Sequence, residues 1–364
     1  MDRRRPEITL QDCKRQRELE FQSVLGKRLS PSEADELEQI LAKKKARLGE
    51  EHRLLEAPWT HLPPLPPALP DYREISIDLG DPWEVEFSGW CRDGKRDAIE
   101  EYIEAQDDEV SEVLLQRGLA SACEGGRAHV ARYLLQKGAK VYGRAVELAS
   151  RRCDLALFEV FVEHGWHPNQ QVPWVQGAFG VALPHCTDDI RVVEFLLTHG
   201  ADPNLGPFDF RKITGSSMTP PLDRCSGAPL NKAARSGSIE VIDLLLQHGA
   251  VLEWSTPLHY ALASWPRNRP AFVHLLHLGA DPNKNIHYDY CTQGEGGTPL
   301  YQAIRFHNWD AIELLLESGA DPEKCDMYTT IAEMDIRAKN QDNSLTKTFT
   351  ALVDKVKQKK KGSS

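Results

Sequence analysis

The sequence lacks the segments that mark membrane-spanning and secreted proteins. It contains no run of about 18 apolar residues, so we expect no membrane-spanning helix. Its first residues, Met1-Asp-Arg-Arg-Arg-Pro6, are not followed by an apolar segment, so we expect no secretory signal. The eight cysteines include no Cys-x-x-Cys pair, which favours reduced thiols in the cytoplasm, the nucleus or both over a disulfide framework.

Motifs that would bind phosphate, activate a nucleophile or hold a catalytic metal are also missing. The chain has no Gly-x-x-x-x-Gly-Lys, no His-Glu-x-x-His and no Gly-x-Ser-x-Gly. Gly294-Glu-Gly-Gly297 lacks a lysine and precedes a helix start, so we interpret it as a flexible part of a loop. His185-Cys186, and His287 with Cys291, have no second pair at zinc spacing. We therefore expect no catalytic residues, no cofactor and no metal.

Positive charge is scarce in most of the chain. Residues 58–354 contain 26 basic and 42 acidic residues and so have a formal charge of −16, whereas residues 1–57 have +1 and the last ten have +5. An acidic body argues against a nucleic-acid backbone lying along it, because like charges repel. It is compatible with basic protein partners.

Residues 1–57 have the polar pattern of two helices. Ser30-Pro31-Ser32-Glu33 is a capping box with proline at the first helical position, so the second helix is expected to begin at Pro31. Charged residues interrupt its apolar seam. It is therefore either a coiled-coil or docking helix, through which the chain could self-associate, or a solvated helix, which we favour. Lys43-Lys-Lys-Ala-Arg47 is either a nuclear-import patch or, as we favour, part of a charged helix face.

Two further segments fall outside the main helical pattern. Residues 58–80 begin with six prolines in thirteen positions, so we expect a Pro-rich, extended linker. Residues 357–364 are expected to form a basic disordered tail. Between them, residues 81–356 show successive helical segments, among them one predicted over 177–185, and we expect these segments to form a single array.

Three short motifs recur within this array. They read Ala228-Pro-Leu-Asn-Lys-Ala233, Thr256-Pro-Leu-His-Tyr-Ala261 and Thr298-Pro-Leu-Tyr-Gln-Ala303. From the proline of each motif to the glycine of the next Gly-Ala there are 20, 22 and 20 residues. Thr256 is expected to cap the helix that Pro257 begins, and a left-handed glycine ends the helix that follows. Such repetition is typical of a solenoid, because one helix pair cannot bury its own apolar face.

The pattern resembles the ankyrin repeat family, whose signature Thr-Pro-Leu-His-x-Ala is matched at every position by residues 256–261. The resemblance is most specific over 228–322. It implies an all-α solenoid of about seven to eight helix-turn-helix repeats with hairpin loops over 81–356, preceded by the polar helical N-terminal region. It also implies that the loop tips and the concave helix surface usually bind another protein.

The loops between repeats differ strongly in length. From the repeat glycine to the next Pro-Leu there are 8 residues after Gly249, but 20 after Gly279 and 29 after Gly200. Two long loops, about 201–228 and 281–297, are therefore expected at one edge, with the short turn between them. Long loops are usually functional or disordered. The candidate partner-binding residues on them are Phe208, Phe210, Arg211, Tyr288 and Tyr290. The alternatives are packing of the two loops against each other, and disorder.

These observations favour a non-catalytic scaffold or adaptor. It would bind protein partners through an acidic concave face and the long hairpin loops, as a monomeric array in the cytoplasm, the nucleus or both, without membrane association. The alternative is a nuclear regulatory factor that associates with nucleic acid through the basic N- and C-terminal segments.

Overall fold

The computed structural model describes residues 30–36, 38–39, 64–70, 82–105, 110–172, 180–207, 222–285, 297–322 and 344–362. The chain divides into two compact units, one formed by Leu65–Ala320 and the other by Met1–Pro64 with Asp321–Ser364. The first of these units contains the repeats and is described first.

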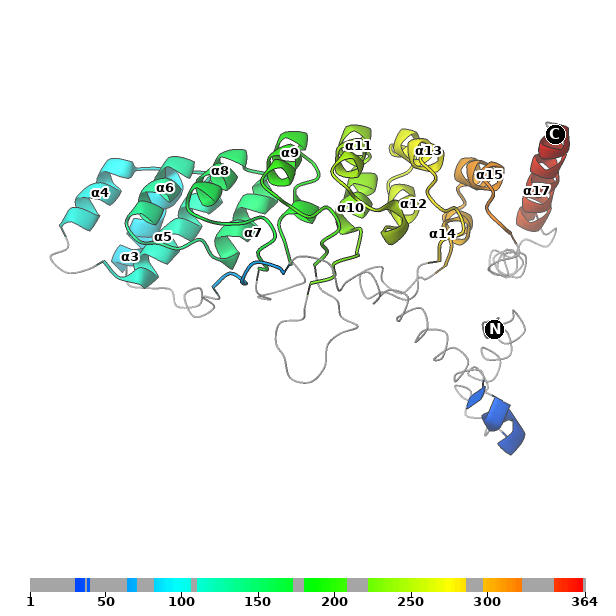
Figure 1. Ribbon diagram of the computed structural model, residues 1–364, viewed down its shortest axis with the longest axis horizontal. Helices are drawn as coiled ribbons and strands as arrows, with labels where there is room; N and C mark the ends of the chain where they lie inside the picture. The colour runs from blue at the N-terminus through cyan, green and yellow to red at the C-terminus, as the bar shows by residue number, and fades with distance from the viewer. Residues whose placement is uncertain are drawn as a thin grey trace. The chain divides into compact units, whose positions relative to one another are not determined.

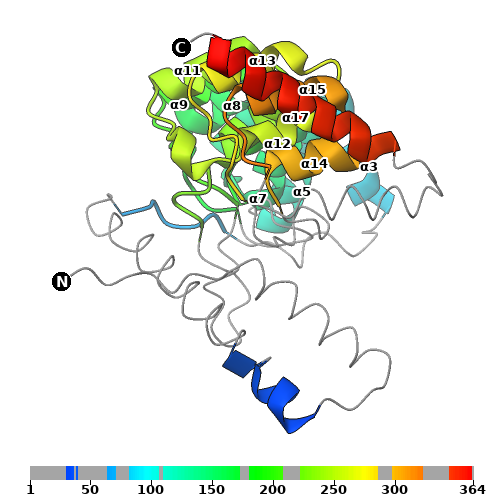
Figure 2. The ribbon, with the colours of Figure 1, turned by 90° about the vertical axis from the view of Figure 1, so that its right-hand side faces the viewer.

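Leu65–Ala320 is built from successive helix pairs that stack in two rows (Figure 1). The first helices of the pairs are α3 (Pro82–Asp93), α5 (Glu112–Gly125), α7 (Gly143–Arg152), α10 (Ala228–Ser236), α12 (Pro257–Leu262) and α14 (Pro299–Arg305). The second helices are α4 (Arg96–Glu104), α6 (Ala128–Gln136), α8 (Leu155–Glu163), α9 (Ile190–Thr198), α11 (Ile239–Gln247), α13 (Arg269–His277) and α15 (Trp309–Glu317). Figure 2 shows α9, α11, α13 and α15 together on one side of α12 and α14. The chain is thus an all-α solenoid, as predicted.

The ends of the helices follow from their capping residues. Ser238 accepts a hydrogen bond from Val241 N at 3.3 Å at the start of α11, and Thr298 accepts one from Tyr301 N at 3.2 Å at the start of α14. Gly249 ends α11 in the left-handed conformation, with φ 92°. The next amide, of Ala250, then donates to Leu245 O at 3.0 Å. This pattern satisfies carbonyls that would otherwise lack partners.

The core is a stripe of apolar residues on each second helix. In α11, for example, Val241, Ile242 and Leu245 are at most 1% exposed, and the spacing i, i+1, i+4 keeps them on one face. The same spacing recurs in α13 and in α15. Contacts run from each pair to its neighbours, as between α10 and α12, α12 and α14, and α11 and α13. Stacking therefore buries faces that a single pair would leave in water.

Two local expectations were wrong. The predicted helix over 177–185 is only a 3-10 turn, η3 (Leu183–His185), and Gly180 instead pairs with Val172 in an isolated β-bridge; residues 177–179 lie outside the described residues. Pro184 explains the short turn, because it removes an amide that a longer helix would use. Thr256 lies at the start of α12, but its side chain makes no capping hydrogen bond.

In the other unit, the structure describes one short helical segment and α17 (Ser344–Gly362). Ser30 and Glu33 form the expected capping box, since Ser30 N donates to Glu33 Oε2 at 3.0 Å and Glu33 N donates to Ser30 Oγ at 3.4 Å. α17 continues to Gly362, so residues 357–362 are helical and not the disordered tail that we expected. Among all described residues, no helix combines the length and the apolar character that crossing a membrane requires.

Candidate functional site

All five candidate partner-binding residues lie outside the described residues. Phe208, Phe210 and Arg211 fall in 208–221, and Tyr288 and Tyr290 fall in 286–296. The structure does describe the positions where both long loops leave the array and return to it. These loop bases, with the helices beside them, form the candidate site.

The first long loop starts and ends at a closed neck. Gly206 N donates to Asp223 O at 2.6 Å, and Ser226 N donates to Asn204 O at 3.2 Å. Gly206 is required here, because a Cβ at this position would collide with the side chain of Ser226. The two ends of the first long loop are therefore held together at residues 204–206 and 223–226.

An apolar cluster lies next to this neck. Val181, Leu205 and Leu222 are at most 5% exposed and pack on one another, with Leu65 of the Pro-rich segment against them. The Pro-rich segment is held further along, where Leu69 N donates to Gln171 O at 2.9 Å. Leu69 itself is 5% exposed. Residues 65–70 of the expected linker thus pack along the loop edge of the array.

Asparagine side chains connect several hairpin loops to the loop that follows. Asn169 donates to Gly200 O at 3.0 Å and accepts from Asp202 N at 2.8 Å. Asn204 makes the same two bonds one repeat further on, to Gly249 O at 2.9 Å and from Val251 N at 2.8 Å. Each side chain satisfies two backbone groups that no helix or sheet satisfies. The loops are therefore fixed to one another at their bases.

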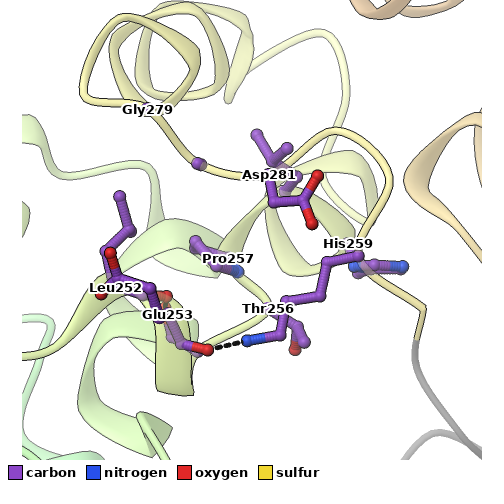
Figure 3. A pocket seen from close by; sticks show the side chains of 11 residues that line it. Leu252, Glu253, Thr256, Pro257, His259, Gly279 and Asp281 are labelled. Atoms are coloured by element: carbon purple, nitrogen blue, oxygen red, sulfur yellow. Dashed lines mark hydrogen bonds between the residues drawn. The ribbon is translucent and has the colours of Figure 1, made fainter. Parts of the chain in front are cut away.

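The second long loop is also held at both ends. Asn283 donates to Gly319 O at 3.0 Å, and the ammonium of Lys284 donates to Glu253 O (dashed line in Figure 3). At the returning end, the imidazole of His259 lies 3.0 Å from Gly297 O through Nε2. Residues 286–296 thus connect two fixed points, as residues 208–221 do in the first loop.

A pocket lies at the short turn between the two loops. It has a volume of about 360 Å³, part of it open solvent. Leu252 and Glu253 lie on one side of it and Asp281 and His259 on the other (Figure 3). Burial lowers the pKa of His259 to about 4, partly offset by its bond to Gly297 O, so the ring is neutral at pH 7. Burial also lowers the pKa of Lys284.

The polar groups in this pocket form structural contacts with the backbone. His259 uses Nε2 on a backbone carbonyl, and Lys284 uses its ammonium on another. The described residues contain no group of three or more His, Cys, Asp or Glu placed to hold a metal ion. The pocket can therefore receive a small side chain at the loop edge, and nothing in its contacts activates a nucleophile.

Charge is separated between the two rows of helices from residue 143 onward. The first helices α7, α10, α12 and α14 contain six basic residues and one acidic residue, a formal charge of +5. The second helices α8, α9, α11, α13 and α15 contain eight acidic and two basic residues, a formal charge of −6. The basic side chains of the first helices are all exposed: Arg144, Arg151, Arg152, Lys232, Arg235 and Arg305.

The negative charge that the sequence indicates for the body is therefore unevenly distributed between the two rows. The negative charge of the body lies largely on the second helices, whereas the exposed face of the first helices is basic. A charge summed along the sequence does not distinguish the two rows. Counting charge by position within each repeat, which the motifs define, would have indicated the difference between the rows.

Comparisons with known proteins agree with the helical pattern. Family models described as "Ankyrin repeats (3 copies)" and "Ankyrin repeat" match residues 186–286 and 295–327. The chain is 32% identical over 120 residues to "Ankyrin repeat protein nuc-2" of Neurospora crassa, covering 32% of this chain and 11% of that protein. It is 31% identical over 105 residues to "Ankyrin repeat and SOCS box protein 5" of Oryctolagus cuniculus, covering 28% and 29%. The chain thus spans less than a third of either relative.

Among solved structures, the chain is similar to the ankyrin repeat domain of Bcl-3. The TM-score is 0.42 and the identity 20%, over 65% of this chain and 99% of that one. Ankyrin repeats are generally non-catalytic modules that mediate protein–protein interaction. The comparisons give no support to the alternative of a nucleic-acid-associated factor.

Proposed function

The chain is an ankyrin repeat protein, and from this premise we propose that it is a non-catalytic adaptor that binds an acidic segment of a partner protein. The charge separation between the two helix rows is the observation that supports this proposal. An acidic segment would lie along the exposed face of α7, α10, α12 and α14, which we call the basic row. The second helices would repel it, so the charge pattern also selects the face.

The basic row suits such a partner in spacing as well as in sign. Lys232 and Arg235 lie three apart on α10, so their side chains project from the same face of that helix. Arg144 and Arg151 flank Glu147 on α7, with Arg144 Nη1 2.9 Å from its carboxylate, so the net charge there stays positive. Complementary charge of this kind mainly raises the association rate and selects against basic partners.

The long loops would add contacts at the edge of this row. Their bases are held by the neck at Gly206 and by the contacts of Lys284 and His259. We assign Phe208, Phe210, Arg211, Tyr288 and Tyr290 to contacts with the partner. Aromatic and arginine side chains often dominate the energy of such interfaces. The array would act as a monomer in the cytoplasm, the nucleus or both.

Affinity purification with the full-length chain as bait tests the proposal. The variant Lys232→Gln with Arg235→Gln removes two positive charges from the basic row and should recover the main partner several-fold less well. With the isolated partner, its Kd should rise by roughly tenfold, and the difference should shrink at about 0.5 M salt because salt screens exposed charges. Captured proteins are identified by mass spectrometry.

A matched control changes the net charge equally on the second helices. Ala156→Glu on α8 with Gln247→Glu on α11 also lowers the charge by two, at exposed positions. This control should bind the partner as the wild type does. Equal loss of binding in both variants, or recovery of nucleic acid in place of an acidic protein, would contradict the proposal.

Replacing residues 208–221 by a short Gly-Ser segment, which spares the buried Leu222, tests the loop contacts separately.

A further inference from the structure

Four cysteines recur at the spacing of the repeats. Cys91, Cys123, Cys153 and Cys186 are 32, 30 and 33 residues apart, so they lie on consecutive repeats. The first two are fully buried, and burial raises the pKa of Cys91 to about 12 and also raises that of Cys123. Buried thiols of this kind react slowly, because the thiolate is the reactive form.

Cys153 and Cys186 differ from the first two because both of their sulfur atoms lie within 4 Å of one backbone carbonyl. Cys153 Sγ donates to Ser150 O at 3.6 Å, and Cys186 Sγ lies 3.9 Å from the same carbonyl. Each thiol also shifts the pKa of the other, which fits their closeness. Cys186 is fully buried, whereas Cys153 is half-buried and reachable from solvent. Two free thiols from neighbouring repeats therefore lie against one carbonyl, with one of them open to small reagents.

The backbone at Cys153 is unusual in a way that helps this contact. Its φ is 48°, in the left-handed region, at the turn between α7 and α8. The matching turns in two other repeats have glycine, Gly126 with φ 68° and Gly237 with φ 82°. A side chain costs energy in this conformation, and such strain often marks a functional position. Cysteine at residue 153 brings a thiol to the next repeat, where glycine could not.

The two thiols differ in how readily they ionise. The hydrogen bond from Cys186 lowers the pKa of Cys153, although burial and the charges of Asp188 and Asp189 act in the opposite direction. Burial raises the pKa of Cys186. Cys153 is therefore the thiol that forms a thiolate first, and Cys186 is its neighbour that stays protonated.

We propose that Cys153 and Cys186 are a peroxide-sensitive dithiol that forms a reversible disulfide between adjacent repeats. The Cys153 thiolate attacks hydrogen peroxide, its S–O bond forms as the O–O bond breaks, and the leaving hydroxide takes a proton to become water. Cys186 sulfur then attacks the sulfenic acid at Cys153. The S–S bond forms as the S–O bond breaks, and the hydroxide leaves as water with the Cys186 proton. In sum, two thiols lose two electrons and one peroxide becomes two waters.

The disulfide would connect the α7–α8 turn to the chain just before α9. It would restrict the movement of two neighbouring repeats relative to each other, on the side of the array that leads to the first long loop. A dithiol reductant reverses the reaction by thiol–disulfide exchange. Oxidation is thus a modification that stiffens one joint of the array without changing its surface charge.

Treating the full-length, reduced chain with hydrogen peroxide tests the proposal. After alkylation of the remaining thiols and digestion without reductant, mass spectrometry should find a peptide pair linked through Cys153 and Cys186, about 2 Da lighter than the two thiols. Dithiothreitol should abolish it. In Cys186→Ser the reaction should stop at the sulfenic acid of Cys153, which a dimedone reagent would label.

Two further variants keep the test decisive. Cys153→Gly, which has the residue of the matching turns and should fold, must lose both the label and the link. Cys225→Ser removes another half-exposed thiol and should leave both unchanged. A first oxidation at another cysteine, an intermolecular link, or unlabelled Cys153 in Cys186→Ser would each overturn the proposal.

Discussion

His259 links the stability of the array to pH. Its side chain is 6% exposed, and burial lowers its pKa from 6.5 to about 4. Between these values the unfolded chain binds a proton that the folded chain does not bind, so stability falls as the pH is lowered through this window. Above pH 6.5 both states are neutral at this residue, and the full contribution is present.

We therefore expect His259→Asn to reduce the pH dependence of unfolding. Asparagine occupies the matching position of the preceding repeat as Asn231, which accepts a bond from Thr256 N at 2.7 Å. Between pH 7 and pH 4 the wild type should lose roughly 3 kcal/mol more stability than the variant. Urea unfolding at pH 7, 5.5 and 4 measures the difference. Identical slopes in both proteins would show that His259 is not buried as a neutral ring.

His307 is a second residue in the left-handed conformation, with φ 52° at the turn between α14 and α15. Because its side chain is exposed, the substitution of glycine removes strain without removing buried contacts. We expect His307→Gly to be about 1 kcal/mol more stable than His307→Ala, which keeps a Cβ in the same conformation. Thermal unfolding of the two variants measures this difference, and an alanine variant as stable as the glycine one would exclude strain at this turn.

At the scale of elements, the asparagine bridges hold neighbouring loops together. Asn204 is 9% exposed and bonds two backbone groups of the next loop. Asn204→Ala would leave Gly249 O and Val251 N without these part-buried bonds, and we expect a loss of roughly 1–2 kcal/mol in urea unfolding. Asn283→Ala is the matched control. Its bond to Gly319 O is exposed, so water replaces this bond and the loss should stay below about 1 kcal/mol. Equal losses would contradict the role of burial.

The elements that the sequence predicted well are those whose signals are local. Pro257 and Pro299 begin helices because the proline ring restricts φ to helical values. Gly249 ends a helix because glycine adopts a positive φ without strain. Both effects are independent of the rest of the chain. The same local reasoning failed over 177–185, where Pro184 leaves room for only a short turn. The apolar periodicity predicts a helix, but a single proline limits its length.

The candidate site was harder to predict because its contacts are non-local. Prolines indicate that residues 64–70 are extended, but they do not indicate that Leu69 N bonds Gln171 O about a hundred residues away. The shared contact of Cys153 and Cys186 with Ser150 O likewise depends on stacking of two repeats. The sequence does contain one indication, the spacing of 33 residues between Cys153 and Cys186. This spacing is noticed only when cysteines are compared at the repeat period, and not when they are searched for as adjacent pairs.

At the scale of the whole repeat unit, stability is distributed over neighbouring helix pairs. The helix α11 contacts α9, α10 and α13, and these contacts bury Leu245 completely. In such an array each pair is stabilised mainly by its neighbours, so damage to one pair should spread over a short distance and then stop. A globular core of the same size would instead lose protection throughout.

Leu245→Ala distinguishes these two behaviours. The substitution creates a cavity and should cost roughly 3 kcal/mol. Hydrogen exchange measured by mass spectrometry should become faster in α9, α10, α11 and α13, while α5 and α6 keep the rates of the wild type. Leu134→Ala in α6, which is also fully buried, should give the reverse pattern. If both variants accelerated exchange evenly from α3 to α15, the unit would unfold as one body, and a disulfide between Cys153 and Cys186 would then stabilise all of it and not one joint.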